Sequence, residues 1–488
     1  MERQSGILLH ITSLPGDYGI GDLGSGAYQF INFLSMSGQS LWQILPIGPT
    51  GFANSPYQSY SAIAGNVLFI SPKQLVTKGL LCEDEIRITR SFPPEKTDYD
   101  EAKEIKEHLF RLAFQRFKGD LSSFYHQNIE WLPDFAMFMA IKSQYNIIWT
   151  KWPTELKYRE PDALESIRES LFDEIQYQIF LQFLFFEQWN NLRKYARKKR
   201  IKIIGDLPIF VSLDSADVWS HPELFDLDEQ LLPREVAGVP PDYFSKKGQL
   251  WGNPLYNWEE HRKQNYSWWK LRFKKLLSLV DIIRLDHFRG FEGYWAVPYG
   301  NKTAENGVWR KGPAEDFFYS IKESLKELPI IAEDLGLITP EVEELRDKFK
   351  FPGLRVLHFG FENIRSNIHT PHNHSYDCVV YTGTHDNDTT LGWYRKNKKE
   401  AQKFIREYLG LHEKVEDQLV VWHLIRTAYA SPARMAIIPM QDFIFLDSDA
   451  RMNMPGTVAN NWQWRVKASQ LTEDLAVKIN HLTNLFAR

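Results

Sequence analysis

Short apolar runs recur along the chain, and each ends in a glycine, a proline or a polar turn. Such runs, separated by stretches with helical periodicity, are typical of alternating strands and helices. In LITPEVEELRDKF, for example, Thr339 can cap a helix whose first position suits Pro340 and whose first turn is rich in glutamate. The pattern predicts eight strands, at 6–10, 41–45, 201–206, 280–286, 329–333, 354–359, 378–382 and 435–439.

Eight strand–helix units predict a closed (β/α)8 barrel, the TIM barrel. Such a barrel needs only roughly 250 residues, and the chain has 488, so the remainder must lie in insertions. We expect a single catalytic domain, 1–488, with a helical subdomain at 73–175 after the second strand. A loop-rich subdomain is expected at 215–275 after the third strand, with its aromatic segment 240–258 over the cleft. Little more than a helical tail follows the last strand, so no C-terminal β-sandwich domain is expected.

Charge and composition narrow the classes of partner. The net charge of −4 provides no basic surface for nucleic acid. Because no apolar stretch is long enough to span a membrane and the start lacks a signal-type core, we expect a cytoplasmic protein. Cys82 and Cys378 stand far apart, which favours reduced thiols. The chain has sixteen tryptophans, and sugar-binding clefts use such aromatic faces, although large aromatic cores account for most of them.

Four acidic residues fall at the predicted strand ends or just beyond them. They are Asp206, Asp286, Glu333 and Asp386. In a parallel barrel the carboxyl ends of the strands converge on one mouth, where such enzymes work. A single acid at a strand end is usually a helix cap or a turn residue, but four in one barrel favour an active site.

A pair of carboxyl groups with different pKa values suits glycoside chemistry. Strand alternation places Arg284 on the same face as Asp286, and a neighbouring guanidinium is expected to lower the pKa of that carboxyl, as a nucleophile requires. Glu333 follows the apolar run 330–332, where partial burial would raise its pKa and retain a proton. These patterns leave open whether Glu333 or Asp334 is the acid.

Further polar and aromatic residues lie near the predicted mouth. His385 precedes Asp386, and both can hydrogen-bond sugar hydroxyls. Tyr57, in the loop 54–61, can stack on a sugar or cover the barrel rim, and the loop carrying Trp251 can close over a bound chain or pack as surface. The cluster His369, His372 and His374 invites a zinc interpretation, but its spacing favours a polar loop, so no metal site is predicted.

Eight motifs resemble, in order, those of the amylomaltases, the 4-α-glucanotransferases of glycoside hydrolase family 77 in the α-amylase clan. They are GILLHITSLPG, LPIGPTG, NSPYQSYSA, GDLPIFV, GQLWGNPLY, RLDHFRGF, IAEDLG and GTHDNDTT. The resemblance implies that Asp286 is the nucleophile, that Glu333 rather than Asp334 is the general acid/base, and that Asp386 stabilises the transition state. It also implies substrate-binding or supporting roles for Arg284, His385, Asp206, Tyr57, Trp251 and Asn253.

The resemblance further implies retaining transfer of an α-1,4-glucan segment to the 4-hydroxyl of an acceptor sugar. Maltooligosaccharides and other α-1,4-glucans would serve as donor and acceptor, with no cofactor, and the protein would be a monomer or a weak homo-oligomer. Two alternatives stay open. Water can replace the acceptor without altering any catalytic residue, which would give a hydrolase, and a non-catalytic glucan-binding protein could use the same scaffold.

Overall fold

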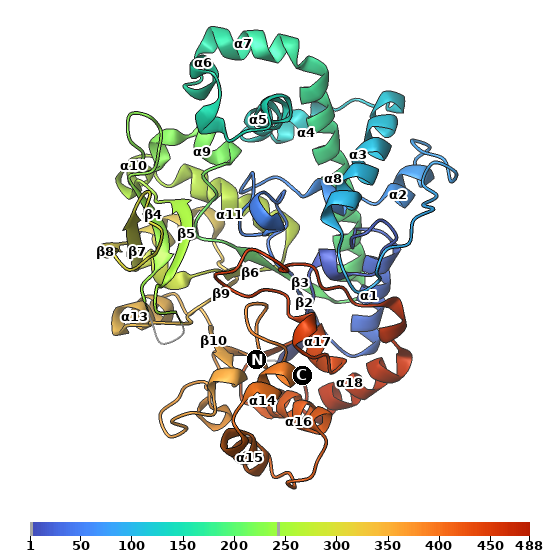
Figure 1. The fold of residues 1–488 in the computed structure, drawn as a ribbon, viewed down its shortest axis with the longest axis vertical. Helices are drawn as coiled ribbons and strands as arrows, with labels where there is room; N and C mark the ends of the chain where they lie inside the picture. The colour runs from blue at the N-terminus through green and yellow to red at the C-terminus, as the bar shows by residue number, and fades with distance from the viewer. Residues whose placement is uncertain (1–2, 242–244) are drawn as a thin grey trace.

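A computed structural model describes residues 3–241 and 245–488. Eight parallel strands close a barrel in the order β1-β12-β11-β10-β9-β6-β3-β2 (Figure 1). All eight predicted strands are confirmed, with ends that differ by a few residues. Their bounds are β1 (Gln4–Leu8), β2 (Leu41–Gln43), β3 (Lys202–Leu207), β6 (Ile282–Leu285), β9 (Ile330–Ala332), β10 (Gly353–Val356), β11 (Cys378–Tyr381) and β12 (Met435–Pro439).

The barrel closes where β1 pairs with both β2 and β12, in registers that include Gly6 opposite Leu41 and Gln4 opposite Met435. A Cβ atom at Gly6 would collide with the carbonyl of Leu41, so this close approach requires glycine. All residues of β11 and β12 are buried. Burial on both faces explains why these strands read as continuous apolar runs rather than as alternating patterns.

Helices surround the barrel. The predicted helix after β9 begins at Pro340, and Thr339 takes the N-cap position, but its side chain makes no capping hydrogen bond, contrary to our expectation. The helices outside the two large insertions are α1 (Ser25–Met36), α12 (Ala314–Leu325), α13 (Pro340–Lys348), α14 (Thr390–Lys396), α15 (Lys399–Tyr408), α16 (Asp417–Ala430), α17 (Met440–Phe443) and α18 (Glu473–Leu485).

The long insertion between β2 and β3 is helical and occupies the upper part of Figure 1. Its aromatic side chains pack together; Phe114 and Phe117, for example, both contact the ring of Phe180 on α8. Its helices are α2 (Pro72–Thr77), α3 (Tyr99–Arg116), α4 (Ser122–Gln127), α5 (Leu132–Tyr145), α6 (Thr154–Lys157), α7 (Pro161–Ser170) and α8 (Phe172–Lys198).

The segment expected to be loop-rich also contains regular structure. It holds α9 (Ala216–Ser220), α10 (Trp258–Lys263), most of α11 (Ser267–Leu279) and two strands, β4 (Glu235–Val239) and β5 (Gln249–Pro254). These strands form an antiparallel sheet, in the order β5-β4-β7-β8, with β7 (Gly293–Pro298) and β8 (Val308–Lys311) from beyond β6. Residues 242–244, including Tyr243 and Phe244 of the predicted aromatic segment, lie outside the described residues.

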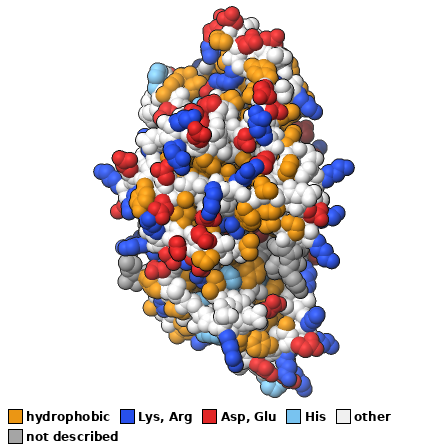
Figure 2. Space-filling model, turned by 90° about the vertical axis from the view of Figure 1, so that its left-hand side faces the viewer, with side chains coloured by type: hydrophobic (Ala, Val, Ile, Leu, Met, Phe, Trp, Pro, Cys, Tyr) orange, Lys and Arg blue, Asp and Glu red, His pale blue; other side chains and the backbone are white. Residues whose placement is uncertain are grey.

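Beyond β12 the chain returns to the mouth of the barrel. The backbone N–H of Asn453 donates to the carbonyl of His385, and that of Val466 donates to the carbonyl of Ser13. The chain then turns back, and the two termini lie near each other at the foot of the barrel (Figure 1), where Arg488 donates to the carbonyl of Gln4. On the face shown in Figure 2, acidic and basic side chains are interspersed. Among the described residues, no helix has the length and apolar character that crossing a membrane requires.

Candidate active site

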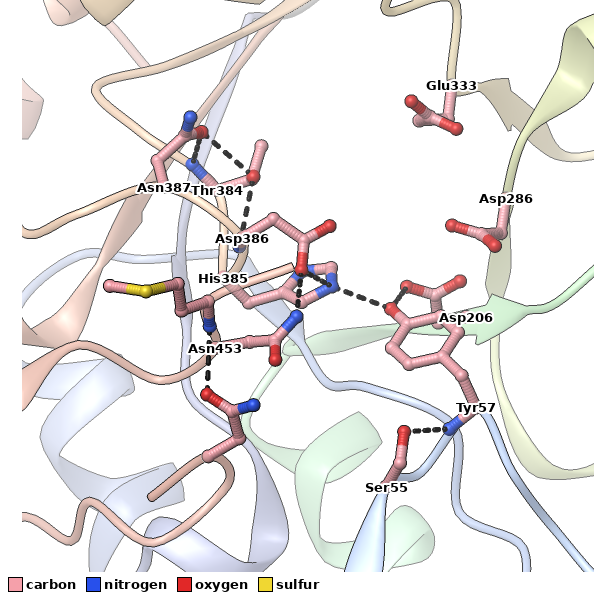
Figure 3. A network of polar contacts seen from close by, with 12 residues as sticks. Ser55, Tyr57, Asp206, Asp286, Glu333, Thr384, His385, Asp386, Asn387 and Asn453 are labelled. Atoms are coloured by element: carbon pink, nitrogen blue, oxygen red, sulfur yellow. Dashed lines mark hydrogen bonds and ion pairs between the residues drawn. The ribbon is translucent and has the colours of Figure 1, made fainter. Parts of the chain in front are cut away.

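The predicted site residues converge at the carboxyl ends of the barrel strands. Asp206 lies in β3, while Asp286 and Glu333 directly follow β6 and β9. His385 and Asp386 occupy the loop after β11. Figure 3 shows the carboxyl groups of Asp286, Glu333 and Asp386 directed toward one shared space. The barrel therefore brings together acids that are far apart in the sequence.

Arg284 donates hydrogen bonds to the carboxylates of both Asp206 and Asp286. Its Nη1 donates to Asp206 Oδ2 at 2.6 Å and to Asp286 Oδ1 at 2.9 Å. The side chains of Arg284 and Asp206 are 4% and 0% exposed, whereas that of Asp286 is 23% exposed. Asp286 thus faces the open space, and the other two side chains support it from beneath.

The pKa of Asp286 differs from our prediction. Burial raises this pKa above its ordinary value, although the Arg284 guanidinium opposes the rise. The expectation that Arg284 would bring the pKa below that of a free carboxyl was wrong, because the loss of solvation outweighs the attraction. Burial likewise raises the pKa of Asp206 to about 7.

Glu333 and Asp334 have different surroundings. Burial raises the pKa of Glu333 well above its usual range, as predicted, and its Oε2 accepts the backbone N–H of His287 at 2.5 Å. His287 adopts a left-handed backbone conformation with φ 47°. Asp334 is buried and accepts hydrogen bonds from Arg346 at 2.5 Å and from the N–H of Leu354 at 2.6 Å. Asp334 is thus engaged with the fold, while Glu333 faces Asp286.

Asp386 is held by residues from the segment after β12. Asn453 Nδ2 donates to Asp386 Oδ1 at 2.6 Å, and Arg451 Nη2 donates to its backbone carbonyl at 2.6 Å. We did not single out Asn453, Arg451 or the His287 backbone from the sequence, although His287 stands in the motif RLDHFRGF. The rule that strand ends meet at the mouth of a barrel applies only to residues at those ends. It does not predict that the segment after the last strand also returns to the mouth.

Tyr57 connects the two sides of the site. Its hydroxyl lies 2.9 Å from Asp206 Oδ2 and 2.9 Å from His385 Nε2 (Figure 3). The rings of Tyr57 and His385 stack with centroids 5.5 Å apart. In this structure the hydroxyl of Tyr57 is therefore engaged with protein groups.

Trp251 and Asn253 both lie in β5 but differ in exposure. Trp251 is half-buried, and its ring meets that of His287 edge to face at 4.8 Å. Asn253 is buried; its amide donates to the carbonyl of Val211 and accepts from Gln58. Trp251 thus borders the residue next to the nucleophile. Among the described residues, no group of three or more His, Cys, Asp or Glu is arranged to hold a metal ion.

Comparison with known proteins identifies the family. The profile of the glycoside hydrolase 77 family, described as 4-alpha-glucanotransferase, matches residues 9–472. The chain belongs to this family. The 4-alpha-glucanotransferase of Synechocystis sp. is 48% identical over 100% of this chain and 98% of its own. That of Thermus thermophilus is 44% identical over 100% and 99%.

Solved structures agree with this assignment. Amylomaltase from Streptococcus agalactiae, determined in complex with acarbose, matches with a TM-score of 0.96 and 40% identity over the whole of both chains. Amylomaltase from Corynebacterium glutamicum, at 18% identity, shares the fold with a TM-score of 0.80 over 100% of this chain and 75% of its own. The predicted resemblance to the amylomaltases and the predicted TIM barrel are confirmed.

Proposed function

We propose that this member of the 4-α-glucanotransferase family transfers segments of α-1,4-glucans with Asp286 as nucleophile and Glu333 as general acid/base. The observation that carries the proposal is the contrast between the two carboxyls. Burial raises the pKa of both groups, but the Arg284 guanidinium, 2.9 Å from Asp286, favours the carboxylate there, whereas the pKa of Glu333 lies well above its usual range.

The reaction proceeds through two displacements. In the first, a carboxylate oxygen of Asp286 bonds to the anomeric carbon while the glycosidic bond breaks, and Glu333 gives its proton to the departing 4-oxygen. In the second, Glu333 takes the proton from the 4-hydroxyl of an acceptor sugar as this oxygen displaces Asp286. The product regains the α-linkage, and both carboxyl groups return to their starting states.

The remaining residues divide into two groups. Asp386 faces the reacting centre, where its negative charge favours an oxocarbenium-like transition state. Trp251 borders the site and offers an aromatic face to a sugar. Each of the remaining five, Arg284, Asp206, Tyr57, His385 and Asn253, makes at least one hydrogen bond within the protein, and we assign them positioning roles.

Incubation with maltotriose alone tests the activity. Glucose and longer maltooligosaccharides at a constant number of reducing ends are expected, because transfer conserves linkages. A steady rise in reducing ends with only shorter products would indicate hydrolysis instead. Asp286→Asn is expected to abolish both outcomes while leaving acarbose binding measurable by calorimetry; normal turnover in that variant would overturn the assignment of the nucleophile.

A second experiment tests Glu333 separately. Maltosyl fluoride carries a leaving group that needs no protonation, so Glu333→Gln is expected to form the ester on Asp286 and then to stall, since no base activates the acceptor. Mass spectrometry should find the added maltosyl group on the peptide that contains Asp286. A label on another carboxylate, or rapid turnover without a label, would contradict the assigned roles.

Two further expectations belong to this proposal. We predict that the protein is a monomer or a weak homo-oligomer, because one chain holds all the proposed catalytic groups. A cytoplasmic location is our prediction from the sequence alone. Light scattering and fractionation of the source cells would test these two statements.

A further inference from the structure

A small cavity lies behind the loop that carries His385. The centre of a water molecule can occupy about 30 Å³ of it, so it has room for at least one water molecule. The cavity is lined from the ends of β1 and β12 and from the segments that follow β1, β11 and β12. The polar members of the lining include His10, Ser13, Thr384, His385, Asp442 and Arg451.

Most of these polar groups already have protein partners. Ser13 Oγ donates to the carbonyl of Trp464 at 2.7 Å, and Thr384 Oγ1 donates to Asn387 at 2.9 Å. Asp442 accepts from Thr382 and Thr390, and Arg451 donates to the carbonyls of Asp386 and Asn453. The two imidazoles are different.

His385 presents an unpaired nitrogen. Its Nε2 lies 2.9 Å from the Tyr57 hydroxyl, but its Nδ1 is buried and has no hydrogen-bond partner. A neutral imidazole has one donor and one acceptor nitrogen, so the contact at Nε2 fixes what Nδ1 needs. Leaving a buried acceptor or donor unpaired costs free energy, so a partner in the cavity is favourable.

The hydrogen bonds of Tyr57 decide the tautomer. The Tyr57 hydroxyl donates to Asp206 Oδ2, whose ionised form the Arg284 guanidinium favours by donating to the same oxygen. Tyr57 then has no second proton for His385, whose Nε2 must carry hydrogen and donate to the Tyr57 oxygen. Asp386 Oδ1, 3.4 Å from Nε2, also favours a proton there. His385 Nδ1 is therefore an acceptor.

His10 supplies the opposite polarity. Its Nδ1 accepts the backbone N–H of Leu45 at 3.2 Å, so its proton lies on Nε2. His10 is buried and lines the same cavity. His10, with a donor nitrogen, and His385, with an acceptor nitrogen, thus line one space that has room for water.

We propose that a water molecule in this cavity accepts the His10 Nε2 proton and donates to His385 Nδ1, which makes His10 a positioning residue for glucan transfer. The hydrogen-bond chain runs from His10 through the water to His385, Tyr57 and Asp206. There it meets Arg284, which contacts the nucleophile Asp286. The inference rests on the proposed function for its kinetic effect, but not for the tautomer that it assigns.

Two substitutions separate the nitrogens of His10. His10→Asn retains an acceptor near Nδ1 for Leu45 but lacks a donor that reaches the cavity, while His10→Gln retains a donor near Nε2 but loses that acceptor. We expect His10→Asn to lower kcat about tenfold with unchanged KM for maltotriose and a Tm close to that of the original protein. His10→Gln should keep most of kcat but have a lower Tm, because the backbone N–H of Leu45 loses its acceptor. Met452→Leu, which keeps an apolar wall on the cavity, is the control.

The tautomer is read directly from ¹⁵N-histidine NMR, with the His385 signal identified by its loss in His385→Gln. We expect a pyrrole-like Nε2 and a pyridine-like Nδ1 in the original protein, and in His10→Asn the same tautomer with the Nδ1 signal moved toward that of an acceptor without a hydrogen bond. The proposal is overturned if His385 carries its proton on Nδ1, or if His10→Asn leaves both the Nδ1 signal and kcat unchanged. Failure of transfer in the original protein together with the expected tautomer would instead count against the proposed function.

Discussion

The high pKa of Glu333 has a consequence for stability. Because burial disfavours the carboxylate, the folded chain binds this proton more tightly than the unfolded chain, whose carboxyl has a pKa near 4.5. Its contribution to stability is present below that value and is lost as pH rises toward the folded pKa. Glu333→Gln should therefore raise Tm at about pH 8 and leave it unchanged at about pH 4, while it abolishes transfer.

Thermal unfolding at the two pH values checks this prediction. Glu343→Gln, on the exposed side of α13, is the matched control and should show no such pH dependence. An equal Tm for Glu333→Gln and the original protein at high pH would mean that the carboxylate is well solvated in the fold.

The charge of Asp386 acts on both reacting carboxyls, since it raises the pKa of Asp286 and that of Glu333. The acid limb of kcat/KM should report Asp286, which must be ionised, and the alkaline limb Glu333, which must be protonated. Asp386→Asn removes the charge and should move both limbs to lower pH, besides lowering kcat. A pH profile of the residual transfer tests this, and limbs that stay in place would separate Asp386 from the pair.

The sequence pattern predicted the positions of the acidic residues but not the pKa of Asp286. Strand ends made Asp286, Asp386 and either Glu333 or Asp334 candidates, because the barrel rule needs only the position of a residue within its strand, and the family resemblance selected Glu333. The sign of the pKa shift at Asp286 was wrong, since it depends on how much solvent the folded cleft removes. Sequence proximity to Arg284 carries no information about that.

At the scale of elements, β9 and β10 meet through a single paired position, Ala332 opposite Gly353. The Asp334 carboxylate adds a second connection, because it accepts the N–H of Leu354 and contacts Arg346 and Arg355. Asp334→Ala would leave two largely buried guanidiniums without this partner, so we expect a loss of about 3–5 kcal/mol in the free energy of unfolding. Denaturant unfolding measures this loss.

Asp347→Ala is the matched control for that loss. Asp347 pairs with the same Arg346 but is 66% exposed. Its removal should cost about 1 kcal/mol or less. Equal losses of stability in the two variants would show that the ion pair with Arg346, rather than the link between β9 and β10, accounts for the effect of Asp334.

The barrel strands were predictable from the sequence, but the strands of the second sheet were not. Buried parallel strands are continuous apolar runs, and all eight were found. The antiparallel sheet was not, since β4 and β5 contain glycine or proline, and β4 pairs with β7 from beyond β6. Pairing across an intervening barrel strand leaves no local pattern in the sequence.

In the whole molecule, the proposed catalytic residues lie at the carboxyl ends of the barrel strands, and the two chain termini meet at the opposite ends of the strands. Arg488 lies at the foot, where its guanidinium donates to the carbonyls of Tyr429 and Ala433 and to that of Ser431 at 2.7, 2.9 and 2.8 Å. Burial lowers its pKa to about 10, so it remains charged at neutral pH. These bonds tie the end of α18 to the end of α16 and the start of β12.

Arg488→Ala should therefore weaken closure without reaching the site. Three short hydrogen bonds to carbonyls would be lost, although Ser431 keeps its bond from Arg3, and at about 1 kcal/mol for each hydrogen bond we expect a loss of about 2–3 kcal/mol in stability. The kcat for maltotriose at a temperature well below Tm should be unchanged, because Asp286 lies at the opposite ends of the strands. Asn484→Ala, exposed on α18 and bonded to Asn480, controls for the helix itself. A fall in kcat without a fall in Tm would show that foot and mouth are coupled.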